Sequence, residues 1–137
     1  MMPRNKFRFL IGKIGLDGHD RGALVVAKHI QKLGHEVIYS GLFNTPKDLV
    51  RITSQEDVDV LGISVMAGSP TLLISDLLEE FKLAKEDLPN IFVGGVINEF
   101  EINELKSLGV HHIFPTGTQL SEITIWIKKL TEITYDE

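Results

Sequence analysis

The chain has 137 residues, of which 43% are hydrophobic and 24% charged; it has no cysteine and a formal net charge of −5. This is the profile of one globular domain over residues 1–137, and it excludes disulfides, thiolate nucleophiles and cysteine-ligated zinc. The negative charge argues against nucleic acid as a partner, and no apolar run reaches the roughly 20 residues of a membrane span. No signal-peptide pattern follows the N-terminus, so we expect a cytoplasmic protein.

Strand and helix patterns alternate along the whole chain. We expect strands at Phe7–Ile14, Glu36–Ser40, Val58–Met66, Asn90–Val96 and His111–Phe114. We expect helices at Ala23–Leu33, Pro46–Ser54, Pro70–Ala84, Glu99–Leu108 and Ser121–Ile133. Five β–α units with short connections predict an α/β fold, a flavodoxin-like (Rossmann-like) doubly wound parallel sheet of five strands in the order 2-1-3-4-5.

In such a sheet, ligands bind outside the carboxyl ends of the strands, at the switch point between strands 1 and 3. The loops at that edge are rich in Gly, Ser, Thr and His, and they comprise Gly15–Gly22, Met66–Pro70, Gly94–Asn98 and Pro115–Leu120. The opposite edge holds ordinary solvated turns, including the one that contains His35. His111 and His112 begin the last strand at that wrong edge, so we expect them to be structural or exposed.

The first of the carboxyl-edge loops carries the pattern Asp17-x-His19-x-x-Gly22. A ligating imidazole needs a hydrogen-bond partner on its second nitrogen, and a carboxylate two residues earlier can supply it. Lys13 is placed to pair with that carboxylate, which predicts a Lys13–Asp17–His19 relay that presents one imidazole nitrogen to a metal. In the alternative interpretation, Asp17 caps the following helix and His19 is a solvated turn residue.

The residues around this pattern add a resemblance. The segment Lys13–Ala23 closely resembles the cobalamin-binding segment of the acyl-CoA mutases, the methylmalonyl-CoA mutase family. The resemblance extends from about Phe7 to about Leu130. It includes the segments Leu42–Pro46, Gly62–Ser64, Gly94–Ile97 and Phe114–Thr118.

The resemblance implies a role for each matching residue. His19 corresponds to the lower axial ligand of cobalt in a base-off/His-on cofactor, with Asp17 as its partner and Lys13 behind it. The nucleotide tail of the cofactor enters a deep cleft between strands 1 and 3, where Ser64 bonds the benzimidazole base and Gly22 lets the tail pass. The cofactor-binding residues implied are Asp17, Gly18, His19, Asp20, Arg21, Gly22, Ser64, Met66, Gly68, Gly94, Gly95, Val96, Phe114, Pro115, Thr116, Gly117 and Thr118.

Several of these residues have a plainer interpretation. Gly94 and Gly95 are also explained by close strand–helix packing, and Thr116 and Thr118 by capping of the last helix. Two departures from the family pattern put individual contacts in doubt. Met66 stands where the family has leucine, and Gly68-Ser69-Pro70 replaces its commoner Gly-His pairing.

By resemblance, the chain is the adenosylcobalamin-binding small subunit of a two-subunit isomerase that carries out a radical 1,2-rearrangement of a branched acyl-CoA. A large barrel-containing subunit is expected to hold the substrate, of the methylmalonyl-, isobutyryl- or 2-hydroxyisobutyryl-CoA type, and the small subunit alone is expected to be inactive. The alternatives are a stand-alone corrinoid carrier or sensor, or the corrinoid protein of a methyltransferase. A phosphoacceptor receiver is rejected because strand 3 does not end in aspartate, and a dinucleotide-binding module because the glycine spacing is wrong.

Two further expectations concern the carboxyl edge. The glycines of the first loop predict that residues Leu16–Ala27 become ordered when cofactor binds. The edge is neither strongly charged nor broadly apolar in sequence, which predicts a modest direct interface with a large subunit.

Overall fold

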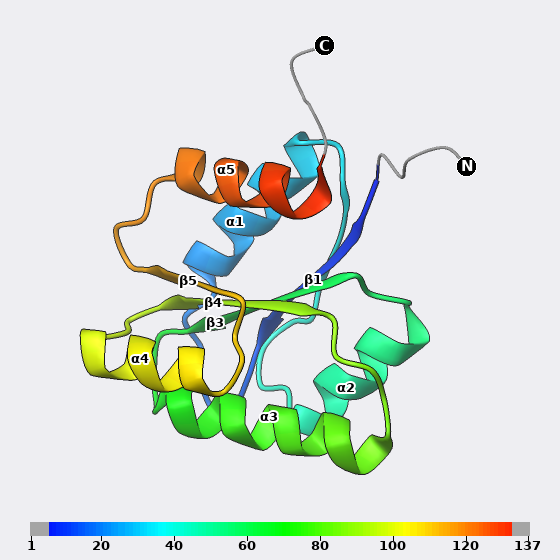
Figure 1. The fold of residues 1–137 in the computed structure, drawn as a ribbon, viewed down its shortest axis with the longest axis vertical. Coiled ribbons are helices and arrows are strands. Elements are labelled where there is room, and N and C mark those ends of the chain that lie inside the picture. The colour runs from blue at the N-terminus through cyan, green and yellow to red at the C-terminus, as the bar shows by residue number, and fades with distance from the viewer. Residues whose placement is uncertain (1–5, 133–137) are drawn as a thin grey trace.

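A computed structural model describes residues 6–132 and shows five strands that alternate with five helices (Figure 1). The strands are β1 (Arg8–Lys13), β2 (Glu36–Tyr39), β3 (Val60–Val65), β4 (Asn90–Gly95) and β5 (His112–Pro115). The helices are α1 (Arg21–Lys32), α2 (Pro46–Gln55), α3 (Pro70–Ala84), α4 (Glu99–Ser107) and α5 (Leu120–Thr131). All ten predicted elements are confirmed, with ends that differ by at most two residues; the predicted end of the last helix, Ile133, lies outside the described residues.

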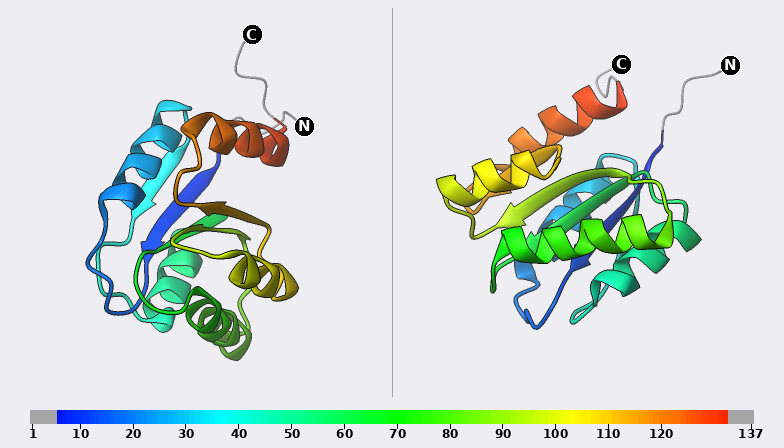
Figure 2. Two further views of the ribbon diagram at one scale, coloured as in Figure 1. Left: turned by 90° about the vertical axis from the view of Figure 1, so that its left-hand side faces the viewer. Right: turned by 60° about the horizontal axis from the view of Figure 1, so that its bottom comes forward.

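The strands form one parallel sheet in the order β2-β1-β3-β4-β5, as predicted. At its centre, Ile11 of β1 pairs with Tyr39 of β2 on one side and with Gly62 of β3 on the other. Helices α1 and α5 cover one face and α2, α3 and α4 cover the other, which makes three layers (Figures 1 and 2). Each helix therefore begins at the carboxyl edge of the sheet.

Two hydrophobic clusters hold the layers together because alternate strand residues point to opposite faces. Leu10, Leu61 and Ile63 pack toward α2, α3 and α4. Phe9 and Ile11 pack toward α1 and α5. The expectation that β3 is covered on both faces is confirmed, since five of its six residues are buried.

Side chains mark the start of most helices. The side chains of Thr45, Ser69 and Asn98 accept hydrogen bonds from the first turns of α2, α3 and α4. Asp20 stands at the N-cap of α1 but makes no capping hydrogen bond there. Helix α1, which follows the Asp17–His19 loop, thus begins without the stabilisation that a capping side chain gives. Within residues 6–132, no helix is long and apolar enough to cross a membrane.

The prediction of a solvated turn around His35 is wrong for the histidine itself. The side chain of His35 is buried, and its Nδ1 accepts a hydrogen bond from the main-chain N–H of Phe7 at 3.1 Å. His111 plays a similar part at β4, where its Nδ1 accepts from the N–H of Ile91 at 3.0 Å. Both imidazoles support the amino edge of the sheet, so His111 is structural as predicted.

Candidate functional site

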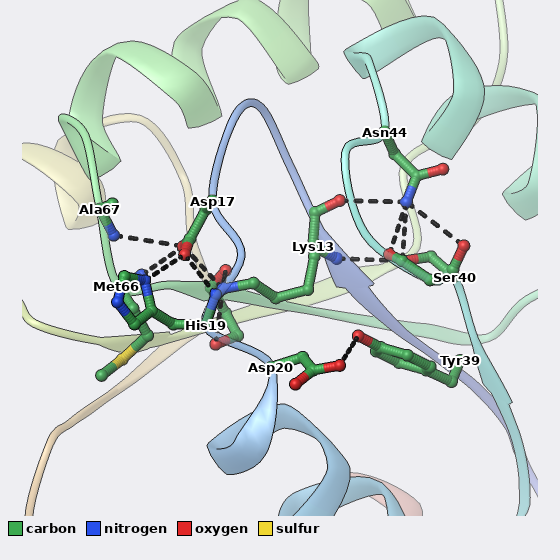
Figure 3. Close-up of polar contacts among 11 residues, drawn as sticks. Lys13, Asp17, His19, Asp20, Tyr39, Ser40, Asn44, Met66 and Ala67 are labelled. Carbon is green, nitrogen blue, oxygen red and sulfur yellow. Dashed lines mark hydrogen bonds and ion pairs between the residues drawn. The ribbon is translucent and has the colours of Figure 1, made fainter.

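Three side chains form a chain of contacts at the carboxyl end of β1 (Figure 3). Lys13 Nζ lies 2.6 Å from Asp17 Oδ2, and Asp17 Oδ1 lies 3.0 Å from His19 Nδ1. Lys13 and Asp17 are buried, whereas the side chain of His19 is 71% exposed. With Nδ1 engaged by the carboxylate, Nε2 is the ring nitrogen left to bind a metal. The predicted relay is present in the structure.

Asp17 is held in place by main-chain donors as well. Its Oδ2 accepts hydrogen bonds from the N–H groups of Met66 at 2.7 Å and Ala67 at 3.2 Å, and its Oδ1 accepts from the N–H of His19 at 3.0 Å. Burial acts to raise the pKa of Asp17, but the hydrogen bonds from Lys13, Met66 and His19 outweigh it and hold the pKa well below the ordinary range. The carboxylate is therefore a fixed anion that joins the loop after β1 to the loop after β3.

The ammonium of Lys13 has three acceptors for its three N–H groups. Besides Asp17, it lies 3.0 Å from the carbonyl oxygen of Ser64 and 3.5 Å from the Ser64 hydroxyl. A buried charge needs this complete set of partners to offset its lost hydration. Lys13 consequently connects Asp17 to β3, a contact that the sequence pattern did not predict.

The opposite side of the Lys13 main chain is held by the loop between β2 and α2. Ser40 Oγ accepts from the Lys13 N–H at 3.0 Å, and Asn44 Nδ2 donates to the Lys13 carbonyl at 3.2 Å. Sequence reasoning gave neither residue a part in the site. The one available signal was that Asn44 lies in the segment Leu42–Pro46, which shares the family resemblance.

A cavity of about 550 Å³ lies beside this loop, between the sheet and helices α1 and α5. The expected cleft between strands 1 and 3 is present, but it continues across β4 as far as β5. The lining residues are Ile11, Arg21, Gly22, Ala23, Val25, Val26, Gly62, Ile63, Ser64, Met66, Phe92, Gly94, Gly95, Phe114, Pro115, Thr116, Gly117, Thr118, Leu120 and Ile123. The volume lies within the roughly 300–1,000 Å³ of small-molecule sites, and a mostly apolar lining with a few polar groups is typical of such sites.

The glycines explain how the cavity stays open. A Cβ on Gly22 or on Gly117 would meet no atom within 4 Å, so a side chain there would point into free space. At Gly95, by contrast, φ is +131° and a Cβ would lie 2.0 Å from the carbonyl oxygen of Val65. At Gly94 a Cβ would lie 3.2 Å from the carbonyl oxygen of Phe114. Gly117 has φ of +99°, a conformation that favours glycine, whereas neither space nor backbone conformation requires glycine at Gly22.

The other predicted site residues divide into two groups. Arg21, Ser64, Met66 and the stretch Phe114–Thr118 line the cavity, whereas Gly18 and Asp20 lie on the loop before α1 and do not. Gly68 and Val96 are exposed at the carboxyl edge outside the cavity. The capping alternative for Thr116 and Thr118 is wrong, because Gln119 is the N-cap of α5 and Thr118 Oγ1 donates to the carbonyl of Pro115.

Large hydrophobic side chains are exposed at the carboxyl edge of the sheet. Six large hydrophobic side chains are exposed in its loops and in the first turns of α3, α4 and α5. They are Leu16, Phe43, Leu72, Val96, Phe100 and Leu120, which we call the carboxyl-edge apolar residues. Leu16 is 95% exposed and Phe100 is 70% exposed. These residues are scattered in sequence, and the parallel sheet places them at the same edge; the modest direct interface with a large subunit stays a prediction.

Comparisons with known proteins identify the family of this chain. A family model, the B12 binding domain, matches residues 7–124. The chain is 38% identical over 133 residues to the 2-hydroxyisobutanoyl-CoA mutase small subunit of Aquincola tertiaricarbonis, a match that covers 94% of this chain and 95% of that protein. It is 39% identical over 116 residues to the pivalyl-CoA mutase small subunit of Xanthobacter autotrophicus, covering 85% and 78%.

A solved structure supports the fold. A cobalamin-binding protein from Desulfitobacterium hafniense superposes with a TM-score of 0.74, covering 89% of this chain and 58% of that one. The two sequences are only 17% identical, so the likeness concerns the three-layer architecture alone.

Proposed function

The chain belongs to the family of B12-binding domains, and we propose that it is the adenosylcobalamin-carrying small subunit of a two-subunit acyl-CoA mutase. One observation carries this proposal: a buried lysine–aspartate pair holds the exposed imidazole of His19, two residues before Arg21 and Gly22, which line the cavity. A single imidazole backed by a carboxylate suits the axial position of a metal that a macrocycle already holds.

Each part of the site has a task in this proposal. His19 Nε2 would hold the cobalt of the cofactor, as the base-off/His-on mode implies. The cavity would take the nucleotide tail, and Ser64, which lines the cavity, would donate a hydrogen bond to its base. Gly22 leaves room for the tail beside α1. When bound, adenosylcobalamin supplies the radical chemistry of a carbon-skeleton rearrangement, while these residues orient it and fix its axial ligand.

The reaction itself is assigned to a second chain. In this proposal no side chain of the site acts as an acid or base toward an acyl-CoA, because Lys13 and Asp17 are buried against each other and His19 is assigned to the cofactor. Radical chemistry needs a site that excludes water and oxygen. The carboxyl-edge apolar residues offer a surface that a large, barrel-containing mutase subunit can cover together with the cofactor. The names of the two small-subunit relatives support the same division of labour and a branched acyl-CoA as the substrate class.

The test combines binding with turnover. Purified chain is mixed with the acyl-CoA mutase large subunit of the same organism, and the mixture is analysed by size-exclusion chromatography with and without adenosylcobalamin. We expect a stable complex only with cofactor, and turnover of a methylmalonyl-, isobutyryl- or 2-hydroxyisobutyryl-CoA substrate only by that complex. Turnover by this chain alone would contradict the assignment. Cobalamin binding with no association would favour the stand-alone corrinoid carrier instead.

A further inference from the structure

The last residues of β1 extend past the end of β2, and the segment that follows β2 supplies their hydrogen-bond partners. The main-chain ladder between these strands stops at Ile11 and Tyr39, and the N–H of Ser40 then donates to the carbonyl of Ile11 at 3.0 Å. From there, side chains replace the ladder. Ser40 Oγ accepts from the Lys13 N–H, and Asn44 Nδ2 donates to the Lys13 carbonyl at 3.2 Å.

Asn44 joins both sides of this junction. Its amide nitrogen also lies 3.0 Å from Ser40 Oγ and 2.8 Å from the carbonyl of Gly41. The main-chain carbonyl of Asn44 accepts a hydrogen bond from the N–H of Gly15 at 2.9 Å, and the main chain of Asn44 forms an isolated β-bridge with Ile14. Asn44 therefore binds the chain just before and just after Ile14, where β1 runs into the loop of Asp17 and His19.

The side chain of Lys13 points away from these contacts. Figure 3 shows Ser40 and Asn44 on one side of the Lys13 main chain and the ammonium reaching Asp17 on the other. A long lysine side chain has several rotatable bonds, so the position of its ammonium depends on how firmly its main chain is held. The contacts of Ser40 and Asn44 supply that fixed point.

The loop that carries Asn44 contains two residues with positive φ. Gly41 has φ of +78° and Phe43 has φ of +61°, a conformation that a bulky residue rarely adopts. The Phe43 ring is 58% exposed, so burial of its side chain does not account for this conformation. Uncommon backbone geometry of this kind is retained where a neighbouring group must be placed accurately.

We propose that Asn44 is a positioning residue for the axial ligand: it fixes the main chain of Lys13 so that the ammonium holds Asp17, which in turn orients His19. This inference rests on the proposed function, because it assigns a task to Asn44 only if His19 ligates cobalt. Asn44 itself touches neither the reacting atoms nor the cavity.

The test compares Asn44→Asp with Asn44→Gln. Aspartate has the same shape but only acceptor oxygens, which would face the carbonyls of Lys13 and Gly41. Glutamine keeps the donating amide, one methylene further out. Asn103→Asp, an exposed position on α4, is the control for the added charge. The readouts are cobalamin affinity and the electron paramagnetic resonance spectrum of bound cob(II)alamin, in which isotope-labelled histidine reports ligation by His19.

We expect Asn44→Asp to weaken cobalamin binding roughly tenfold, the equivalent of one or two lost hydrogen bonds, and to lower the fraction of His19-ligated cobalt. Asn44→Gln should restore part of both, and Asn103→Asp should change neither. In the cofactor-free protein, amide exchange at Lys13 and Gly15 should be faster in Asn44→Asp than in wild type. Should Asn44→Asp not fold, Ser40→Ala replaces it with the same expectation.

The outcomes separate the two proposals. If wild type binds cobalamin without a signal from His19, the proposed function fails, and the positioning role fails with it. If wild type shows the signal and Asn44→Asp keeps the same affinity and ligated fraction, this inference alone is overturned. A loss of stability with an unchanged ligated fraction also overturns it, because Asn44 would then serve the fold only.

Discussion

Lys13 Nζ lies 2.6 Å from Asp17 Oδ2, and neither side chain is more than 2% exposed. Removing one member of a buried ion pair leaves the other charged without compensation. We expect Lys13→Met to lower the free energy of unfolding by about 3–5 kcal/mol, as measured by urea denaturation of the cofactor-free protein. Lys28→Met, at an exposed position on α1, is the matched control and should change it by less than about 0.5 kcal/mol. Equal effects of the two substitutions would contradict the structural role of the pair.

The axial-ligand assignment predicts different losses at His19 and Asp17. His19→Ala should abolish tight cobalamin binding or leave the cofactor base-on, because no imidazole remains to displace the benzimidazole. Asp17→Asn should keep binding but weaken it about 10–100-fold, as loss of an outer partner of a metal ligand does. Visible spectra and titrations measure both effects. An unchanged spectrum and affinity in His19→Ala would show that another group ligates cobalt.

A substitution at Gly22 is expected to change the affinity for cobalamin without lowering the free energy of unfolding. Gly22→Leu replaces a helical glycine with a good helix former where the added Cβ meets nothing, so the free energy of unfolding should stay constant or rise by up to about 1 kcal/mol. The leucine side chain would enter the cavity and weaken cobalamin binding. Cobinamide, which lacks the nucleotide tail, should bind wild type and variant equally well. Equal affinity of the two proteins for cobalamin would place the tail elsewhere.

His35 predicts a pH dependence of stability that does not involve the cofactor. Burial lowers the pKa of His35, and protonation would also break the hydrogen bond from the Phe7 N–H to Nδ1. The unfolded chain therefore binds more protons, so stability is complete above about pH 6.5 and falls as the pH drops below it. His112, whose pKa is lowered by burial and then by Lys106 and Lys129, adds to the same slope.

The measurement is urea denaturation of His35→Gln and wild type between pH 8 and pH 5 (about the range in which histidine titrates). Glutamine can accept the Phe7 hydrogen bond through its carbonyl oxygen without gaining a charge. The variant should lose less stability than wild type as the pH falls, while the contribution of His112 persists. If the free energy of unfolding of the two proteins depended on pH in the same way, folding would not change the pKa of His35, and this prediction would be wrong.

Hydrogen exchange tests the ordering of the loop and of α1. Asp17 is held by hydrogen bonds such as that from the Met66 N–H, but the side chain of Asp20, the N-cap of α1, makes no capping hydrogen bond. We expect amides within residues Leu16–Ala27, above all those after Asp17, to exchange more slowly when cobalamin is bound. Amides of α3, whose first turn is capped by Ser69, serve as the internal reference. Equal protection of the loop in both states would mean that it is already ordered.

Local patterns in the sequence were sufficient for the architecture. Alternation of apolar runs and capped helices gave the five units, and the handedness of β–α–β connections leaves few ways to order them in a sheet. The relay followed from spacing as well, because Lys13 at the end of β1 and Asp17 and His19 in the loop after it lie within seven consecutive residues. Residues so close in sequence can take only a few relative positions, so their spacing predicts contact between their side chains.

Contacts between distant segments were decided only by the tertiary structure. Lys13 meets Ser64 and Asn44 because β1 lies between β3 and the end of β2, and no local pattern reports which donors reach its main chain. The burial of His35 depends on the aromatic rings of Phe7 and Phe9 beside it. Likewise, the carboxyl-edge apolar residues are single positions in separate loops and helix starts, and they lie at one edge only because every strand of a parallel sheet ends on the same side.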